Sequence, residues 1–456
     1  MSEWKKVKIG DVCKIVKGTT GIASAVPGEF PLVVTAVERK TCSTYQFDCE
    51  AVCIPLVSSS GHGKKSLNNV HFQSGKFALG TILCAVIPNN PDELDARYLH
   101  QYLQFYKDTV LVPLMKGAAN VSLSMKDIAG VEVPLPPIKK QCELSAMFVS
   151  LQEKSLEFKK ETDKQVEYVK LLRQSILQNA IEGKLTEDWR KQHPVQKGDP
   201  DYDAEALFEQ IQKEKYHTDL FAPNGAHAKK AKSVSSEPIR VTKKEKSLPP
   251  ITEDEIPFEI PTGWKWVRLG EICRKLTDGS HNPPPNSGKG YPVISAMNIK
   301  NGRISLDNVI RYTDENGFQR ENKRTSITKG DIIMGIIGAS IGNVAIYDHD
   351  KKVIAQRSIA IIDALIDNVF VLNALNSIFI QKYLNEKAFG SAQGGVYLGK
   401  ISNIPFPLPS LAEQKEIVAR VEQHLQTITQ LETQIATRET TTKQLMQSIL
   451  KDAFEE

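Results

Sequence analysis

The sequence has no apolar run long enough to cross a membrane and no pairing pattern among its cysteines. Apolar stretches in its 456 residues never approach the roughly 18 consecutive positions that a transmembrane helix needs. The seven cysteines form no C-x-x-C pair, so neither a disulfide framework nor a zinc cluster is indicated. The opening residues, MSEWKK, lack the pattern of a signal peptide, and we therefore expect a cytoplasmic protein.

An excess of one charge sign is also missing. Lys and Arg number 58 against 54 Asp and Glu, which gives a net charge of +4. Nucleic-acid binding would therefore need local basic patches, because the chain as a whole is not strongly basic. The length exceeds that of one ordinary hydrophobic core, and the 41% hydrophobic content is typical of a globular protein. We expect at least two domains.

The motifs of an enzyme acting on DNA are incomplete. The segment HNPPP at residues 281–285 resembles the Asn-Pro-Pro-aromatic motif of adenine methyltransferases, but Pro285 stands where the aromatic ring would stack on a flipped base. The segment GGVYLGK at residues 394–400 has the Walker A spacing, but Ile401 occupies the Ser/Thr position that binds magnesium. These departures predict a binding protein with no catalytic residues, no metal and no cofactor of its own.

The sequence contains two copies of one domain opening. WKKVKIGDVC at residues 4–13 matches WKWVRLGEIC at residues 264–273 at an offset of 260. FPLVVTA at residues 30–36 likewise resembles YPVISAM at residues 291–297, each a proline within an apolar run typical of a strand. Such self-similarity indicates a duplicated domain.

Each copy closes with a proline-rich hinge and a long helical segment. VEVPLPPIKKQ at residues 131–141 matches IPFPLPSLAEQ at residues 404–414, and RQSIL at residues 173–177 matches MQSIL at residues 446–450, all at an offset of 273. The constant offset predicts two helices of equal length, each of about 42 residues and on the order of 60 Å at 1.5 Å per residue. Helices this long need a partner, and the obvious partner of each is its repeat.

A heptad-like seam supports this pairing. Apolar residues recur at steps of three and four, with polar interruptions that can fix the register. The apolar positions are Leu144, Phe148, Leu151, Phe158, Val169, Leu172 and Ile176 in the first copy, and Ile417, Val421, Ile428, Leu431, Ile435, Leu445 and Ile449 in the second.

These observations predict five segments. They are a first domain at residues 1–137, a central helix at 138–185, a charged linker at 186–260, a second domain at 261–408 and a C-terminal helix at 409–456. The linker is rich in Lys, Glu, Ser and Pro, with an island of helical pattern at residues 204–215.

The combination resembles the specificity subunits of type I restriction-modification enzymes. The most specific matches are the domain opening at residues 264–272, the PLPSLAEQ hinge at residues 407–414, the Gln-Ser-Ile-Leu helix ends and DGSH at residues 278–281. The first copy departs from the pattern, because its hinge lacks the acidic residue that Glu413 supplies. This departure leaves the edges of the first domain less defined.

The resemblance implies an α+β fold with two mixed α/β target-recognition domains, separated by two long antiparallel coiled-coil helices with pseudo-twofold symmetry. It implies that this chain reads DNA and binds no cofactor. Two modification subunits would carry S-adenosylmethionine and methylate adenine at N6, docking on the outer faces of the helices. Restriction subunits using ATP and magnesium would cleave unmodified DNA. A fused DNA methyltransferase and a coiled-coil scaffold unrelated to DNA remain the alternatives.

Two related domains held apart by helices would read a bipartite, asymmetric target, with a spacer set by helix length. Base reading requires polar side chains on exposed loops, with Arg or Lys suited to guanine and Asn or Gln to adenine. Phosphate contact is expected of the lysines. The candidate DNA-binding residues are His62, Lys64, Lys65, Lys116, Asn120, His281, Lys289, Arg303, Arg320, Arg324, Asn343, Gln393 and Tyr397.

Overall fold

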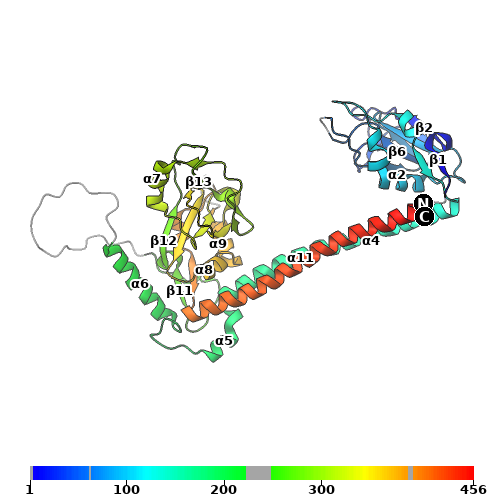
Figure 1. Cartoon of the computed structure of the whole chain (residues 1–456). Coiled ribbons are helices and arrows are strands. Elements are labelled where there is room, and N and C mark those ends of the chain that lie inside the picture. Colours follow the sequence, from blue (N-terminus) through cyan, green and yellow to red (C-terminus); the bar gives the residue numbers. More distant parts are fainter. Residues whose placement is uncertain (1–3, 61–62, 222–247, 389–393, 456) are drawn as a thin grey trace, which may run out of the picture. The chain divides into compact units, whose positions relative to one another are not determined.

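The computed structural model describes residues 4–60, 63–221, 248–388 and 394–455 (Figure 1). The chain divides into two compact units, Met1–Lys164 with Ile435–Glu456, and Gln165–Gln434. The long helices α4 (Ile138–Ile181) and α11 (Leu411–Glu455) each contribute to both units. Within the described ranges, no helix combines the length and apolarity that a membrane span requires. The predicted mixture of helices and sheets is confirmed.

The first unit is built on two four-stranded sheets. One has the order β2-β9-β6-β7 and is antiparallel throughout, and the other has the order β4-β3-β8-β5. Its elements are β1 (Lys6–Lys8), α1 (Ile9–Val12), β2 (Cys13–Lys17), β3 (Phe30–Val33), β4 (Lys40–Cys42), β5 (Phe47–Asp48), β6 (Ala51–Pro55), β7 (His71–Gln73), β8 (Lys76–Leu79), β9 (Leu83–Pro88), α2 (Ala96–Val110), η1 (Val112–Leu114), α3 (Met125–Ala129) and β10 (Glu132–Pro134).

Strand β6 shows why the core of this unit has two layers. All five of its residues are buried, and successive side chains of a strand point to opposite faces. Val52 and Ile54 pack in one hydrophobic cluster with residues of α2, while Ala51 and Cys53 pack in another with the second sheet. An apolar strand without alternation is therefore the strand that lies between two packed layers.

The second unit repeats this topology. Its antiparallel sheet has the order β12-β20-β17-β18, and a three-stranded sheet has the order β16-β13-β19. Its strands are β11 (Lys265–Arg268), β12 (Cys273–Asp278), β13 (Tyr291–Ile294), β14 (Ile299–Lys300), β15 (Arg303–Ile304), β16 (Tyr312–Thr313), β17 (Ile332–Gly335), β18 (Val344–Ile346), β19 (Ile354–Ala355), β20 (Ile359–Ala364) and β21 (Pro405–Leu408). Its helices besides α4 and α11 are η2 (Lys184–Thr186), α5 (Glu187–Gln192), α6 (Ala204–Phe221), η3 (Glu253–Glu255), η4 (Leu269–Glu271), η5 (Ala296–Asn298), α7 (Glu315–Thr325), η6 (Gly338–Ser340), α8 (Asn368–Leu375), α9 (Ile378–Ala388) and α10 (Leu398–Ser402).

The repeat extends to strand register. In the first unit β1 pairs antiparallel with β10, with Val7 opposite Val133. In the second, β11 pairs with β21, with Val267 opposite Phe406. These pairs are related by the same two offsets, 260 and 273, that the sequence shows. The sequence repeat is therefore a repeat of hydrogen-bonded structure.

A buried glutamine fixes the first turn of α4 to its domain. Gln141 is fully buried, and its side-chain oxygen accepts a hydrogen bond from the backbone N–H of Asp95 at 2.8 Å. Its side-chain nitrogen donates to the carbonyls of Glu93 and Pro136, each at 2.8 Å. Asp95 is itself the N-cap of α2, since its carboxylate accepts from the N–H of Tyr98. One amide thus joins the starts of two helices.

The second unit has the same joint. Gln414 is fully buried, accepts from the backbone N–H of Asp367 at 3.2 Å and donates to the carbonyl of Pro409 at 3.0 Å. Asp367 caps α8 through the N–H groups of Val369 and Phe370. The glutamine of each hinge motif therefore has a structural role at the base of each long helix.

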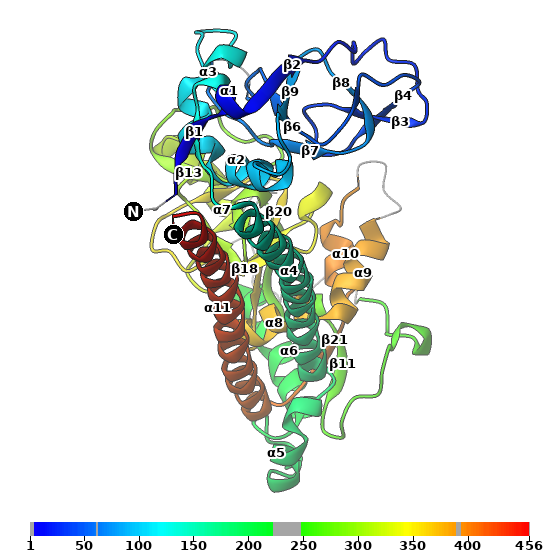
Figure 2. The same ribbon diagram turned by 90° about the vertical axis from the view of Figure 1, so that its right-hand side faces the viewer.

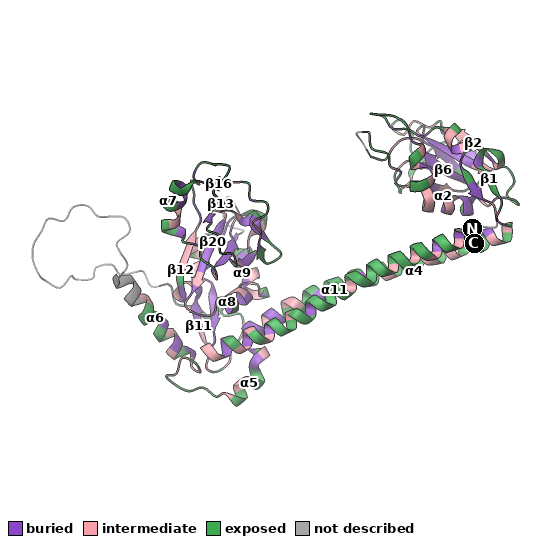
Figure 3. Ribbon diagram, viewed as in Figure 1, coloured by how far each residue is buried: buried purple, intermediate pink, exposed green. Residues whose placement is uncertain are grey.

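In each unit α4 and α11 run side by side in opposite directions, as both Figure 1 and Figure 2 show. In the first unit Arg438 lies 5.9 Å from the ring centroid of Phe158. In the second, Arg173 forms an ion pair with Glu432 at 3.2 Å. Burial colouring shows that large parts of both helices face solvent (Figure 3).

Three leucines assigned to the seam are exposed, which corrects that part of the prediction. Leu172, Leu431 and Leu445 are 46%, 37% and 59% exposed. A pair of helices buries only one narrow stripe on each, and positions such as Val169 and Ile428 fill it. Leu172 and Leu445 occupy equivalent places in the two copies, so this exposure is itself repeated.

The segment expected to be a charged linker, residues 186–260, is partly folded. It contains α5, α6 and η3, and its helical pattern at residues 204–215 lies within α6. Ala204, Leu207 and Ile211 are buried. Amphipathic spacing and ion pairs hold this part of the segment against the second domain, although its composition is that of a tether.

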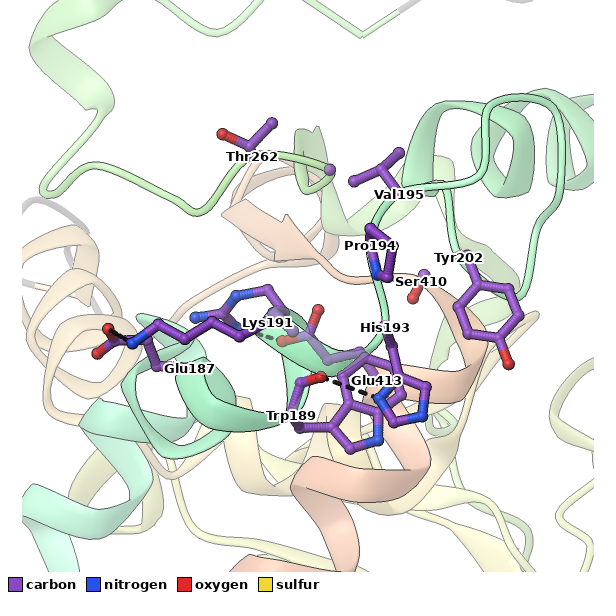
Figure 4. A pocket seen from close by; sticks show the side chains of 12 residues that line it. Glu187, Trp189, Lys191, His193, Pro194, Val195, Tyr202, Thr262, Ser410 and Glu413 are labelled. Atoms are coloured by element: carbon purple, nitrogen blue, oxygen red, sulfur yellow. Dashed lines mark hydrogen bonds and ion pairs between the residues drawn. The ribbon is translucent and has the colours of Figure 1, made fainter.

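Glu413 is the centre of this attachment. Its carboxylate is buried and accepts hydrogen bonds from the Thr186 hydroxyl at 2.6 Å and the Trp264 indole at 2.7 Å, and it pairs with Arg190. Figure 4 shows Glu413 in a pocket beside Trp189. The pocket volume is about 310 Å³, and the Trp189 ring stacks on His193 with centroids 4.2 Å apart.

Further along, residues 248–258 form a strap across the same domain. Arg268 is buried, and its guanidinium pairs with Glu255 at 2.6 Å and donates to the carbonyls of Pro249 and Pro250. Because the Arg268 guanidinium hydrogen-bonds the carboxylate, the pKa of Glu255 falls from 4.5 to about 2.

We predict that Phe454→Ala destabilises the first unit by roughly 3 kcal/mol, because truncating a buried phenylalanine leaves a cavity. Phe454 is 4% exposed and packs against the rings of Tyr98, Tyr102 and Phe105. Urea unfolding, with hydrogen exchange in α2 to identify the unit, measures the loss. Leu445→Ala on the same helix is the control and should change stability little.

We also predict that the stabilisation contributed by Glu255 depends on pH. Because its pKa is depressed on folding, the contribution is present above the unfolded value near 4.5 and is lost as the pH falls toward 2. The difference in unfolding free energy between the native chain and Glu255→Gln should therefore be largest above pH 5 and shrink on acidification. Glu253→Gln, at an exposed position of the same segment, should show no such trend.

Candidate nucleic-acid interface

The polar loops lie together at one end of the strands in each antiparallel sheet. In the first unit β2 and β6 both run antiparallel to β9, with Lys17 opposite Cys84 and Pro55 opposite Leu83. The ends of β2 and β6 therefore meet where β9 begins. In the second unit β12 and β17 end beside the start of β20 in the same way. We call this side of each sheet the loop edge.

Two glycines allow the chain to turn at the loop edge. A Cβ on Gly18 would lie 2.2 Å from the carbonyl oxygen of Gly80, and a Cβ on Gly279 would lie 2.0 Å from that of Gln356. Both contacts are with backbone, which cannot move aside as a flexible side chain can. The glycine of the DGSH motif is thus needed for close backbone approach.

The structure brings together the two candidate loops of the first domain. The N–H of Ser58 donates to the carbonyl of Val121 at 3.0 Å, and Val57 forms an isolated bridge with Ser122. Gly63 lies so close that a Cβ there would be 2.2 Å from the carbonyl oxygen of Ala118. Residues 58–60, 63–66 and 116–121 therefore form one surface that extends from the end of β6.

Four of the five candidates of this domain lie on that surface. Lys64, Lys65, Lys116 and Asn120 are exposed. Lys116 forms an ion pair with Asp127 at 3.1 Å, so its charge is partly neutralised. His62 lies outside the described residues.

The second domain has the equivalent pair of loops. Ile337 bridges to Gly395, and the N–H of Gly338 donates to the carbonyl of Gly394 at 3.1 Å. The Walker-like segment therefore pairs with the loop that follows β17. Asn343 and Tyr397 are exposed in these loops, and Gln393 lies outside the described part of the chain.

His281 and Arg324, far apart in sequence, meet at the same edge. The His281 Nε2 lies 2.9 Å from one oxygen of Asp278, while Arg324 donates to the other oxygen at 3.0 Å and to the carbonyl of Gly279 at 2.6 Å. Helix α7, which carries Arg324, thereby holds the DGSH turn in place. Both terminal nitrogens of the Arg324 guanidinium already have partners.

Three further candidates are exposed and form no hydrogen bond or ion pair with His281, Asp278 or Arg324 in the described structure. Lys289 lies in the turn before β13, and Arg303 lies in the β14–β15 hairpin. Arg320 is on α7 and pairs with its neighbour Glu321.

Sequence reasoning did not select Arg357, which lies between β19 and β20. Its backbone N–H donates to the carbonyl of Ser280 at 3.1 Å, and its side chain is exposed with no hydrogen bond or ion pair to any described residue. Thr81 donates to the carbonyl of Thr20 at the same place in the first domain. The signal in the sequence was a short polar stretch, residues 356–358, between two apolar strands.

The chemistry of these surfaces suits recognition by hydrogen bonds and charge. Among the described side chains, no group of three or more His, Cys, Asp or Glu is arranged to hold a metal ion. Figure 4 places the pocket around Glu413 among residues of the folded linker and the second hinge, and none of the candidate residues lines it.

A family model described as the type I restriction modification DNA specificity domain matches residues 1–168 and 261–438. The chain belongs to this family. The two matched segments contain the sheets of both domains, both hinges and the first part of each long helix, and the folded linker lies between them.

Known relatives are specificity subunits of type I restriction enzymes. The EcoBI subunit of Escherichia coli is 31% identical over 47% of this chain and 46% of its own length. The EcoAI subunit is 26% identical over 63% of this chain and 45% of its own length. The match therefore spans less than half of these two relatives. The EcoDI subunit is 22% identical over 99% of this chain and 88% of its own length.

Solved structures share the fold. The HsdS subunit from Thermoanaerobacter tengcongensis has a TM-score of 0.53 at 18% identity, covering 99% of this chain and 96% of that one. A chain from a structure on complex assembly and conformational transition of the type I R-M system has a TM-score of 0.58 at 17% identity, covering 99% and 97%.

We predict that Arg324→Ala loosens the DGSH turn, because it removes two anchors of that turn. Hydrogen exchange at residues 279–281 should become faster, as measured by mass spectrometry. Arg320→Ala is the matched control on the same helix, since Arg320 pairs only with its neighbour. Equal exchange in the two variants would contradict a positioning role for Arg324.

Proposed function

We propose that this chain is the DNA-reading, non-catalytic subunit of a type I restriction-modification assembly in the cytoplasm. The observation that carries the proposal is the duplicated loop edge: two domains of one topology each gather exposed polar side chains at the same end of the same sheet. A catalytic chain would need one assembled reaction centre, whereas two matched recognition surfaces suit a target with two parts.

The two parts of the target should differ in sequence. The first loop edge offers lysines and Asn120, and Thr81 occupies the place of Arg357. The second offers His281, which Arg324 helps to position through the DGSH turn, and Arg357, and among the described residues a helix at the place of α7 occurs in this copy alone. Because base identity is read by the donors and acceptors that a surface presents, unlike surfaces select unlike half-sites. An asymmetric, interrupted sequence follows.

The residue types suggest which side chains contact phosphates and which contact bases. Lys64 and Lys65 are exposed long cations, suited to phosphates, which fix the position of the protein without reading bases. Asn120 and Asn343 can donate to and accept from adenine, and Arg357, whose guanidinium has no partner among the described residues, suits guanine. These assignments explain why a chain with a small net charge can still bind DNA.

Chemistry on the DNA belongs, in this proposal, to partner subunits. Two modification subunits carry S-adenosylmethionine and methylate adenine at N6 in each half-site, and restriction subunits use ATP and magnesium. Exposed apolar side chains on α4 support docking of partners along the helix. In the second unit Tyr168, Leu171 and Leu172 are 65%, 50% and 46% exposed, and their spacing places them on one face.

The decisive experiment is methylation-sensitive sequencing of DNA from cells that express the assembly. We predict a bipartite, asymmetric motif. Replacing residues 1–135 with those of a relative should change one half-site and leave the other half-site and the spacer unaltered. A continuous palindrome, or a change in both halves after the exchange, would contradict two independent readers.

A further inference from the structure

The two domain openings differ in what covers them. Strand β11 of the second domain lies beneath the folded linker and the strap, and Arg268 is buried there. In the first domain, at the equivalent register, Lys6 and Lys8 of β1 and Lys5 just before it are exposed. Equivalent surfaces of one fold are thus covered in one copy and open in the other.

Acidic side chains of the linker and strap neutralise the covered surface. Lys265 forms an ion pair with Glu205 of α6 at 2.7 Å, and Arg268 forms one with Glu255 of the strap at 2.6 Å. Between them, Trp266 packs against Phe258 of the strap with ring centroids 5.2 Å apart. The linker and the strap are therefore an example, within this chain, of segments that cover this surface.

The open surface of the first domain has the cations but lacks these partners. By the 260-residue offset, Lys5 and Lys8 correspond to Lys265 and Arg268, and Lys6 replaces Trp266. None of the three lysines forms an ion pair within the described structure. Glu132 lies opposite Lys8 in the ladder of β1 and β10, but the two described side chains form no ion pair. The open face is thus more basic than its covered counterpart.

This face is distinct from the loop edge. Strand β1 leads through α1 into the start of β2, where Cys13 pairs with Pro88. The loop edge lies at the other end of β2, where Lys17 pairs with Cys84. DNA contacted at the loop edge therefore does not account for the basic face.

We propose that the β1 face of the first domain docks an acidic segment of a partner protein, in the manner in which the chain's own linker and strap cover β11. The occupant presents carboxylates to Lys6 and Lys8, which lie on one side of the strand, and to Lys5 at its start. These three positions match those that Phe258, Glu255 and Glu205 contact in the second domain. This inference rests on the proposed assembly with partner subunits, but does not depend on which bases are read.

Carbodiimide cross-linking of the assembly, purified from cells that co-express all its subunits, tests the contact directly. The reagent joins a lysine amine to a carboxylate only where the two touch. Mass spectrometry should find Lys5 or Lys8 linked to Asp or Glu of a partner subunit. Lys14 and Lys40, exposed on other strands of this domain, serve as controls and should not be linked.

A charge reversal supplies the quantitative test. Lys5→Glu with Lys8→Glu should weaken binding of the partner subunit to the full chain roughly tenfold, because each exposed pair contributes modestly and reversal adds repulsion. The loss should diminish at high salt. Lys14→Glu with Lys40→Glu has the same change in net charge and should leave binding unaltered. Circular dichroism checks that both variants fold.

Two outcomes would overturn the proposal. Absence of cross-links from these lysines, with partner binding unchanged by the reversal, would remove the docking site. Loss of DNA affinity in the reversed chain, with partner binding intact, would identify phosphates as the occupant. If the proposed function is wrong, DNA binding will show no sequence preference. The cross-linking result can still be interpreted in that case.

Discussion

The buried amide at the start of each long helix is the joint on which the arrangement depends. Gln141 and Gln414 each satisfy backbone groups of the hinge and of the helix that Asp95 or Asp367 caps. A buried amide without such partners would be costly, so this geometry is strongly specified. The direction of each long helix is therefore fixed relative to the sheet of the domain that precedes it.

Much of the architecture could be predicted because the chain repeats itself. The offsets of 260 and 273 identify paired strands and hinges, and structure follows both. Burial within the helical seam was less predictable, since Leu172 and Leu445 fit a heptad yet face solvent. The periodic pattern shows which positions are apolar, but the surface of the partner helix determines which of them are buried.

The sequence predicted the type of candidate site but not all of its residues. Exposed polar loops indicated Lys64 and Asn120, and the fold places their loops together. Arg357 was missed because a single polar turn between strands resembles any hairpin until the sheet order is known. The pairing of Arg324 with Asp278 across 46 residues was equally invisible, because tertiary contacts between a helix and a turn leave no periodic signal.

The two hinges differ because each contacts different residues. Glu413 receives the Trp264 indole, the Thr186 hydroxyl and the Arg190 guanidinium, two of which come from the folded linker after α4. Lys140 occupies the matching position of the first hinge. A buried carboxylate is tolerated where a cation and donors meet it and is costly where they do not. The departure of the first hinge from the family pattern is thus the expected consequence of a linker whose described residues fold onto the second hinge.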